Sequence, residues 1–202
     1  LGKHASGIFT GKQQAVINIP SIPDVNSYTL KIPAEILSSA GTSSMIINTP
    51  LGNITIPCGM LSNMKEIDGK TASMSIAAGD ASKLPEDVRT AIGDRPILQL
   101  TLALDGVEVD WNNPSAPVWV TIPYVPAATE KNDPESIVVW YIDAQGNTIA
   151  IPNGYYNKSI DAVSFSTTHF SDFAIDFNPI YFKDVSGNAW YSSAVRFIAA
   201  RG

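Results

Sequence analysis

Apolar and polar side chains alternate with a period of two along most of the chain. In residues 71–77, for example, Ala72, Met74 and Ile76 alternate with serine and threonine, and residues 97–104 place four leucines on one parity. This period is typical of β-strands with one buried face. The same pattern predicts eleven short strands, at residues 15–19, 28–32, 44–48, 54–57, 71–77, 97–104, 118–122, 137–142, 147–151, 162–167 and 169–177.

Turn residues separate these segments at short intervals. Asp105–Gly106 and Gln145–Gly146–Asn147 carry hairpin signals, and proline starts and glycine stops predict short helices at residues 33–41 and 84–93. Strands and helices do not alternate regularly, and no internal repeat is visible. We therefore predict a mainly β fold, an antiparallel β-sandwich over residues 8–177 with one or two short helices.

The pattern changes in residues 178–202, where helical spacing replaces alternation. Four apolar side chains recur at i, i+4, i+7 and i+8, namely Trp190, Ala194, Phe197 and Ile198. They predict a helix with one apolar face. Asn188 is expected to cap its start, and Gly202 stands at its end.

Residues 182–202 resemble the opening of an S-layer homology domain. The matching positions are Phe182, Asp184, Val185, Trp190, Tyr191, Ala194, Val195, Phe197 and Gly202. The later part of that repeat, with its Thr-Arg-Ala-Glu-type motif, is absent from this chain. The resemblance implies that residues 178–202 are the truncated beginning of such a domain, with a wall-anchor motif at Phe182, Asp184, Val185, Trp190 and Tyr191. It also implies that the complete region of the parent protein binds cell-wall polysaccharide.

Residues 137–175 are similar to a module that often precedes such anchors in surface proteins of Gram-positive bacteria. The similarity lies in a "WYIDAQG" hairpin that leads to the strand "FSTTHFS". It implies a secreted, extracellular parent protein on the bacterial cell surface or S-layer. The chain starts at Leu1 and shows no signal peptide, so we interpret it as a fragment or processed form.

His169 is one of only two histidines, and it lies two residues before Ser171. If residues 163–177 stay extended, both side chains share the core-facing parity with Val163 and Phe173, whereas Phe170 faces away. Buried polar groups of this kind need hydrogen-bond partners.

The sequence His169–Phe170–Ser171, followed by Asp-Phe-Ala-Ile, also resembles the cleavage motif of autoproteolysing β-sandwich domains. In that chemistry the Ser171 hydroxyl attacks the carbonyl of Phe170, and an N→O acyl shift gives an ester that water hydrolyses. His169 would take the hydroxyl proton as general base, since its ordinary pKa lies near 6.5. The alternative is a structural histidine in the last strand.

Composition and charge bear on the other classes of function that the chain could have. The net charge of −6 comes without any basic stripe, which argues against a nucleic-acid partner, and no apolar run is long enough for membrane insertion. The single Cys58 excludes an intrachain disulfide and a cysteine-based metal site, and we expect no cofactor and no metal. Aromatic residues that could form a sugar-binding platform are Trp111, Trp119, Trp140, Tyr124, Tyr141, Tyr155 and Tyr156.

Three functions therefore stay open. The first is a non-catalytic spacer or presenting module next to the wall anchor of a cell-surface protein. The second is a self-cleaving domain that cuts between Phe170 and Ser171. The third is a carbohydrate-binding module.

Overall fold

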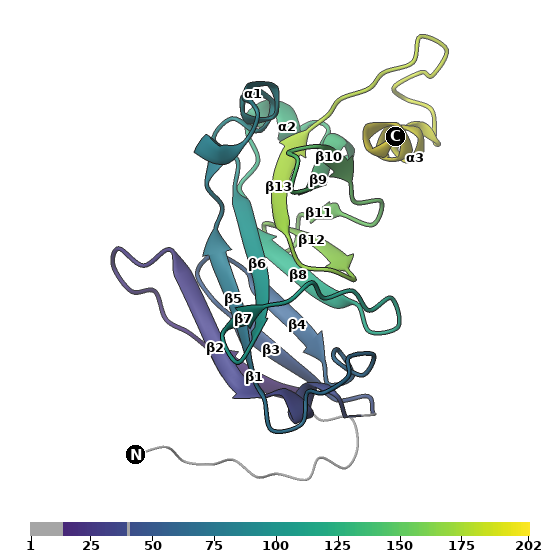
Figure 1. Ribbon diagram of the computed structural model, residues 1–202. Helices are drawn as coiled ribbons and strands as arrows, with labels where there is room; N and C mark the ends of the chain where they lie inside the picture. The colour runs from purple at the N-terminus through teal and green to yellow at the C-terminus, as the bar shows by residue number, and fades with distance from the viewer. Residues whose placement is uncertain (1–13, 40) are drawn as a thin grey trace.

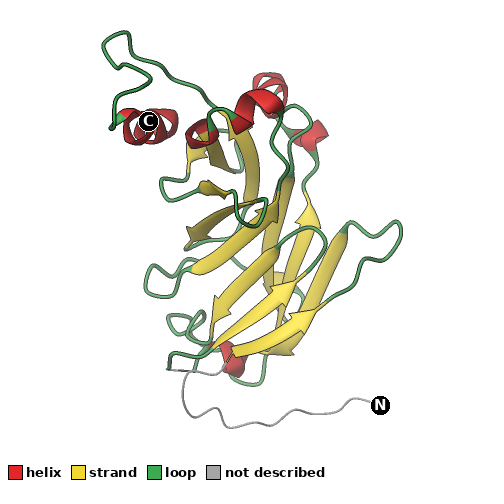
Figure 2. Ribbon diagram, turned by 180° about the vertical axis from the view of Figure 1, so that it is seen from behind, coloured by secondary structure: helices red, strands yellow, loops and turns green. Residues whose placement is uncertain are grey.

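A computed structural model describes residues 14–39 and 41–202 and shows a mainly β chain with two sheets (Figures 1 and 2). The first sheet has six strands, in the spatial order β1 (Gln14–Asn18), β3 (Ser44–Asn48), β4 (Asn53–Pro57), β8 (Val118–Pro123), β12 (Ala162–Thr167) and β11 (Tyr155–Asn157).

The second sheet has seven strands. Six follow the spatial order β10 (Thr148–Ala150), β9 (Ile137–Ile142), β13 (Asp172–Phe177), β6 (Ile97–Leu104), β5 (Thr71–Ala78) and β2 (Ser27–Pro33), and β7 (Val107–Glu108) pairs with β6. We call residues 14–177, which contain both sheets, the two-sheet body.

One hydrophobic core lies between the two sheets. Val120 and Phe165 from the first sheet join Leu100 and Phe173 from the second in the same buried cluster. The rings of Phe165 and Phe173 meet at 4.9 Å between centroids. The alternation read from the sequence therefore has its expected cause in strands such as β3, β4, β5, β6 and β8, each of which buries one parity in this shared layer.

Two features of the sheets differ from the prediction. β1 pairs with β3 in parallel, with Gln14 opposite Ser44, so the first sheet is not wholly antiparallel. The intervening β2 lies in the other sheet, and the chain therefore returns to the first sheet in the direction in which it left. The short strands β7 and β11 were not predicted, and residues 8–13 of the predicted sandwich lie outside the described residues.

The helices are short. They are η1 (Ala34–Leu37), η2 (Ala81–Lys83), α1 (Glu86–Ile92), α2 (Ala128–Lys131), η3 (Pro134–Ser136) and α3 (Ser192–Arg201). Helix α1 covers the outer face of β9 and β13, where Val88 and Ile92 pack with Ile142 and Ala174 in a second cluster. Helix α3 lies beside the end of the body formed by β9, β10 and β11 (Figure 1).

Candidate functional site

Residues 168–171 carry the chain from β12 in one sheet to β13 in the other. The Thr168 carbonyl accepts a hydrogen bond from the Asn113 amide (2.8 Å), and the Ser171 carbonyl accepts one from the Leu100 amide (2.9 Å). His169 forms an isolated bridge with Asn112. The predicted strand at residues 169–177 is therefore wrong in its first three residues, since β13 begins only at Asp172.

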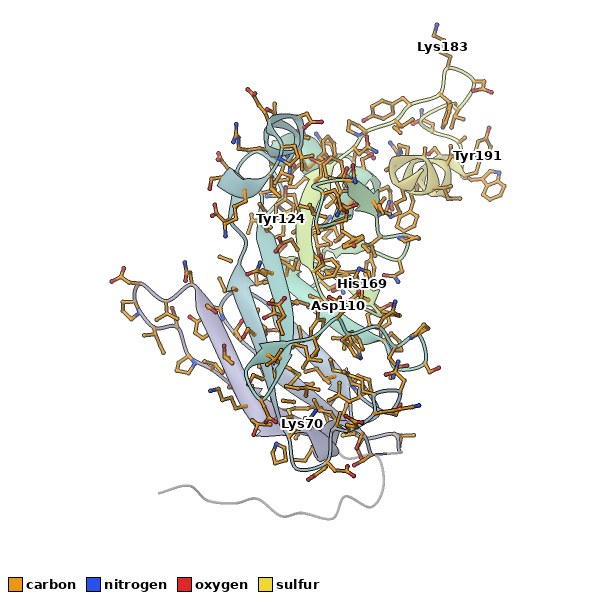
Figure 3. All side chains as sticks on the ribbon, in the orientation of Figure 1. Lys70, Asp110, Tyr124, His169, Lys183 and Tyr191 are labelled. Carbon is orange, nitrogen blue, oxygen red and sulfur yellow. The ribbon has the colours of Figure 1, made fainter. Side chains whose placement is uncertain are left out.

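His169 lies in the middle of the two-sheet body, against aromatic side chains (Figure 3). Its ring meets the Tyr141 ring edge-on at 4.5 Å and lies 6.0 Å from the Phe173 ring. Its Nε2 is buried and has no hydrogen-bond partner among the described residues. Burial lowers the pKa of this imidazole below its ordinary value, so that the ring is neutral at neutral pH.

The two residues that follow His169, Phe170 and Ser171, each make contacts of their own. Phe170, expected on the opposite face, packs against the main core, with its ring 4.9 Å from that of Trp111. The Ser171 Oγ donates to the Ile142 carbonyl oxygen at 2.9 Å. Thr167 Oγ1 donates to the His169 carbonyl oxygen at 2.8 Å. Successive side chains at 169 and 170 both turn inward because the chain bends as it crosses between the sheets.

This arrangement places a neutral imidazole two residues before a hydroxyl, which are the groups that an N→O acyl shift needs. The Ser171 hydroxyl, however, donates its hydrogen bond to the Ile142 carbonyl oxygen and not to His169. Backbone strain of the left-handed kind is found elsewhere among the described non-glycine residues, at Asp24, Glu66, Asp105 and Asp161.

The C-terminal helix is attached to the two-sheet body by Arg201. Its guanidinium donates to the carbonyl oxygens of Gly154 (3.0 and 2.6 Å), Glu135 (2.9 Å) and Ile137 (2.9 Å). Burial lowers the pKa of Arg201 to about 10, so that the group is still charged at neutral pH. The sequence gives no local signal for this role, because the acceptors lie far away along the chain.

A second set of contacts around Asp133 supports the same attachment. Asp133 Oδ2 accepts hydrogen bonds from Ser136 (2.7 Å) and Tyr181 (2.9 Å), and its Oδ1 lies 3.5 Å from Arg196 Nε. The Asn178 main-chain amide donates to the Ser136 carbonyl oxygen at 2.9 Å, and within the segment Asn178 Nδ2 donates to the Ala200 carbonyl oxygen at 2.7 Å. Both ends of residues 178–202 are thus held by polar groups on the body.

Among the residues of the expected wall-anchor motif, Tyr191 lies on the side of α3 that faces away from the two-sheet body (Figure 3). Phe182, Asp184, Trp190 and Tyr191 are exposed, Trp190 to 93%, and Val185 is partly buried. The predicted apolar face of the helix is wrong: Trp190 precedes α3, and Ala194 and Ile198 are exposed. Tyr191, rather than Asn188, is the N-cap residue. Polar contacts, and not that apolar stripe, hold the helix.

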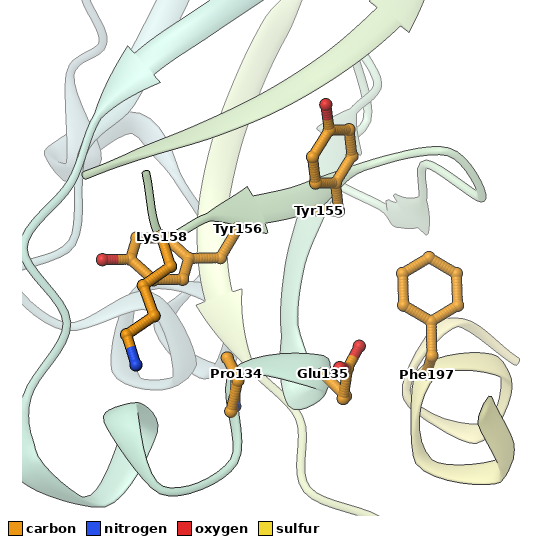
Figure 4. Close-up of a pocket in the computed structure, with 6 residues that line it drawn as sticks. All are labelled: Pro134, Glu135, Tyr155, Tyr156, Lys158 and Phe197. Atoms are coloured by element: carbon orange, nitrogen blue, oxygen red, sulfur yellow. The ribbon is translucent and has the colours of Figure 1, made fainter. Parts of the chain in front are cut away.

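An open cavity of about 510 Å³ lies where α3 meets the body. Figure 4 shows the residues that line it, which are Pro134, Glu135, Tyr155, Tyr156, Lys158 and Phe197. They come from η3, from β11 and the turn after it, and from α3. Tyr155 and Tyr156 were among the aromatic candidates, but β11 was not predicted, and so neither was this cavity.

The other aromatic candidates do not form a platform. Trp111 and Tyr124 are buried, and Trp111 Nε1 donates to the Met60 carbonyl oxygen at 2.8 Å. Tyr141 packs against the main core, whereas its neighbour Trp140 packs against the cluster under α1. Trp119 is 49% exposed on the outer face of the first sheet.

Within residues 14–39 and 41–202, no three histidine, cysteine or acidic side chains are grouped so that they could hold a metal ion. No helix in this part of the chain is both long and apolar enough to cross a membrane.

The chain matches no protein-family model, no curated protein and no solved structure.

Proposed function

We propose that this chain is a non-catalytic spacer and presenting module of a bacterial cell-surface protein. In this proposal residues 8–177 form a β-sandwich, and residues 178–202 begin an S-layer homology domain. The complete domain of the parent protein would bind cell-wall polysaccharide, and the sandwich would hold the rest of the parent away from the wall.

The observation that carries the proposal is the polar attachment of α3 to the two-sheet body. Arg201 donates to three main-chain carbonyl oxygens of the body, and at the other end of the segment the Asn178 amide donates to the Ser136 carbonyl oxygen. Hydrogen bonds from a charged donor are stronger than neutral ones. Such an attachment fixes the orientation of α3 relative to the two-sheet body, which a spacer next to an anchor requires. It also leaves Trp190 and Tyr191 exposed.

Labelling of intact cells tests the placement of the module. We expect antibodies raised against the 202-residue chain to label unbroken cells of the source bacterium, and we expect the label to disappear after the wall polysaccharide is extracted. Labelling that requires cell lysis would contradict the proposal. An antibody against a cytoplasmic protein is the control for cell integrity.

A further inference from the structure

We infer that the cavity between β11, η3 and α3 is a binding site for a neutral saccharide. The inference is independent of the wall placement proposed above, because it rests only on the cavity and its lining. Its volume of about 510 Å³ falls within the range of small-ligand sites in proteins, roughly 300–1,000 Å³.

The lining combines ring surfaces with a few polar groups. Tyr155, Tyr156 and Phe197 contribute aromatic rings, and Pro134 contributes an aliphatic one. In Figure 4 the Phe197 ring on α3 stands across the cavity from Tyr156 and Lys158. A pyranose ring offers apolar C–H faces and a rim of hydroxyls, so that its faces suit the rings and its hydroxyls suit the polar groups.

The charges in the lining indicate which saccharide fits. One carboxylate, Glu135, and one ammonium, Lys158, line the cavity, so that its formal charges cancel. Both groups can hydrogen-bond hydroxyls or an acetamido group. A strongly acidic or basic sugar would meet one repulsive group, and we therefore infer a neutral or N-acetylated unit.

Much of the site is fixed before any ligand binds. The Tyr156 hydroxyl donates to Asp161 Oδ1 at 2.8 Å, and its ring meets Tyr124 edge-on. The Arg201 guanidinium lies 3.5 Å from the centre of the Phe197 ring. Tyr155, in contrast, is 40% exposed, and no side-chain hydrogen bond ties its hydroxyl among the described residues. Fixed rings lower the entropy cost of binding, and Tyr155 offers the accessible face.

The test uses the 202-residue chain with two uncharged probes, tetra-N-acetylchitotetraose and cellotetraose. Binding is followed by calorimetry and by amide chemical shifts. We expect saturable shifts confined to residues 134–135, 155–158 and 197 for at least one probe. The absence of saturable shifts with both probes up to about 10 mM would overturn the inference, as would shifts centred elsewhere.

Two exposed aromatic residues give a matched pair of variants. We expect Tyr155→Leu to weaken binding about 10-fold, because it removes a stacking face but keeps apolar volume. Trp119→Leu, on the outer face of the first sheet, should leave the affinity unchanged. An equal loss in both variants would contradict the site. If Tyr155→Leu melts at a lower temperature, the affinity is measured on Glu135→Gln instead. This variant keeps the main-chain contact between residue 135 and Arg201.

Discussion

Arg201 donates two hydrogen bonds to the main-chain carbonyl oxygen of Gly154, 47 residues earlier in the chain. The same guanidinium reaches the carbonyls of Glu135 and Ile137. Glu135 lies in η3, Ile137 is the first residue of β9, and Gly154 lies directly before β11. One side chain therefore satisfies three main-chain acceptors and couples the last helix to the two-sheet body.

Arg201→Ala is expected to release α3 without unfolding the two sheets. Loss of charged hydrogen bonds to partly buried carbonyls costs about 2 kcal/mol or more, which corresponds to a roughly 30-fold faster amide exchange in Ser192–Arg201. Hydrogen exchange measured by mass spectrometry checks this. Arg89→Ala, at an exposed arginine in α1, is the control and should leave α3 exchange unchanged. Unaltered exchange in Arg201→Ala would remove the basis for a rigid joint.

Tyr124 and Arg95 hold a buried carboxylate in α2, which contacts η3. Glu130, 2% exposed, accepts from the Tyr124 hydroxyl (2.6 Å), the Ala127 amide (2.8 Å) and Arg95 Nε (2.8 Å). We expect Tyr124→Phe to lower the free energy of unfolding by about 1–2 kcal/mol, because the carboxylate loses a donor that water cannot replace. Chemical denaturation measures this, with the exposed Tyr155→Phe as control. Equal stability of the two variants would contradict the prediction.

The same carboxylate predicts a dependence on pH. Burial raises the pKa of Glu130, but hydrogen bonds from Tyr124, Ala127 and Arg95 outweigh burial and hold it below the ordinary value. Its contribution to stability is therefore present above the ordinary glutamate pKa, and is lost as the pH falls through the lowered folded-state value. In Tyr124→Phe the loss should begin at higher pH. Asp176, whose Oδ1 lies 3.5 Å from Arg95 Nη1, has the opposite effect on stability. Burial raises its pKa, so its ionisation disfavours the folded state as the pH rises.

The strand pattern was predictable because it depends on local alternation. The predicted ranges 44–48, 97–104, 137–142 and 162–167 coincide with β3, β6, β9 and β12. The strands β7 and β11 have two and three residues, too few to show a period. Sequence patterns therefore gave the two-layer core, but not the edge strand that forms the cavity.

The candidate site was less predictable, because distant partners fix it. His169 and Phe170 both turn inward where the chain crosses between the sheets, with Asn112 and Trp111 as partners. Trp190 is exposed although it has helical spacing, because α3 begins after it and polar groups hold the helix. A side chain such as Arg201, whose acceptors are distant main-chain carbonyls, leaves no pattern in a single sequence.

His169 is expected to make the protein less stable in mild acid. Burial lowers the pKa of this imidazole, so its contribution to stability is fully present above the ordinary value near 6.5 and is lost as the pH falls through the lowered folded-state value. His169→Phe keeps a ring against Tyr141 and Phe173 and removes the titration. Thermal melts between pH 7 and pH 4 should show a smaller decrease in melting temperature for this variant than for the unsubstituted chain. Parallel decreases would show that His169 does not titrate in this range.

Ser171 allows the non-catalytic proposal to be tested against self-cleavage. The Ser171 hydroxyl donates to the Ile142 carbonyl oxygen, so its proton is not directed to His169, and we expect the Phe170–Ser171 bond to remain intact. Mass spectrometry after several days at pH 7 and pH 8.5 should show one species of 21.6 kDa. Ser171→Ala should also remain intact. Because it lacks the hydrogen bond to Ile142, its free energy of unfolding should be lower by about 0.5–1.5 kcal/mol. A fragment that begins at Ser171 in the parent chain, but is absent from Ser171→Ala and His169→Phe, would establish the acyl-shift chemistry and replace the non-catalytic proposal.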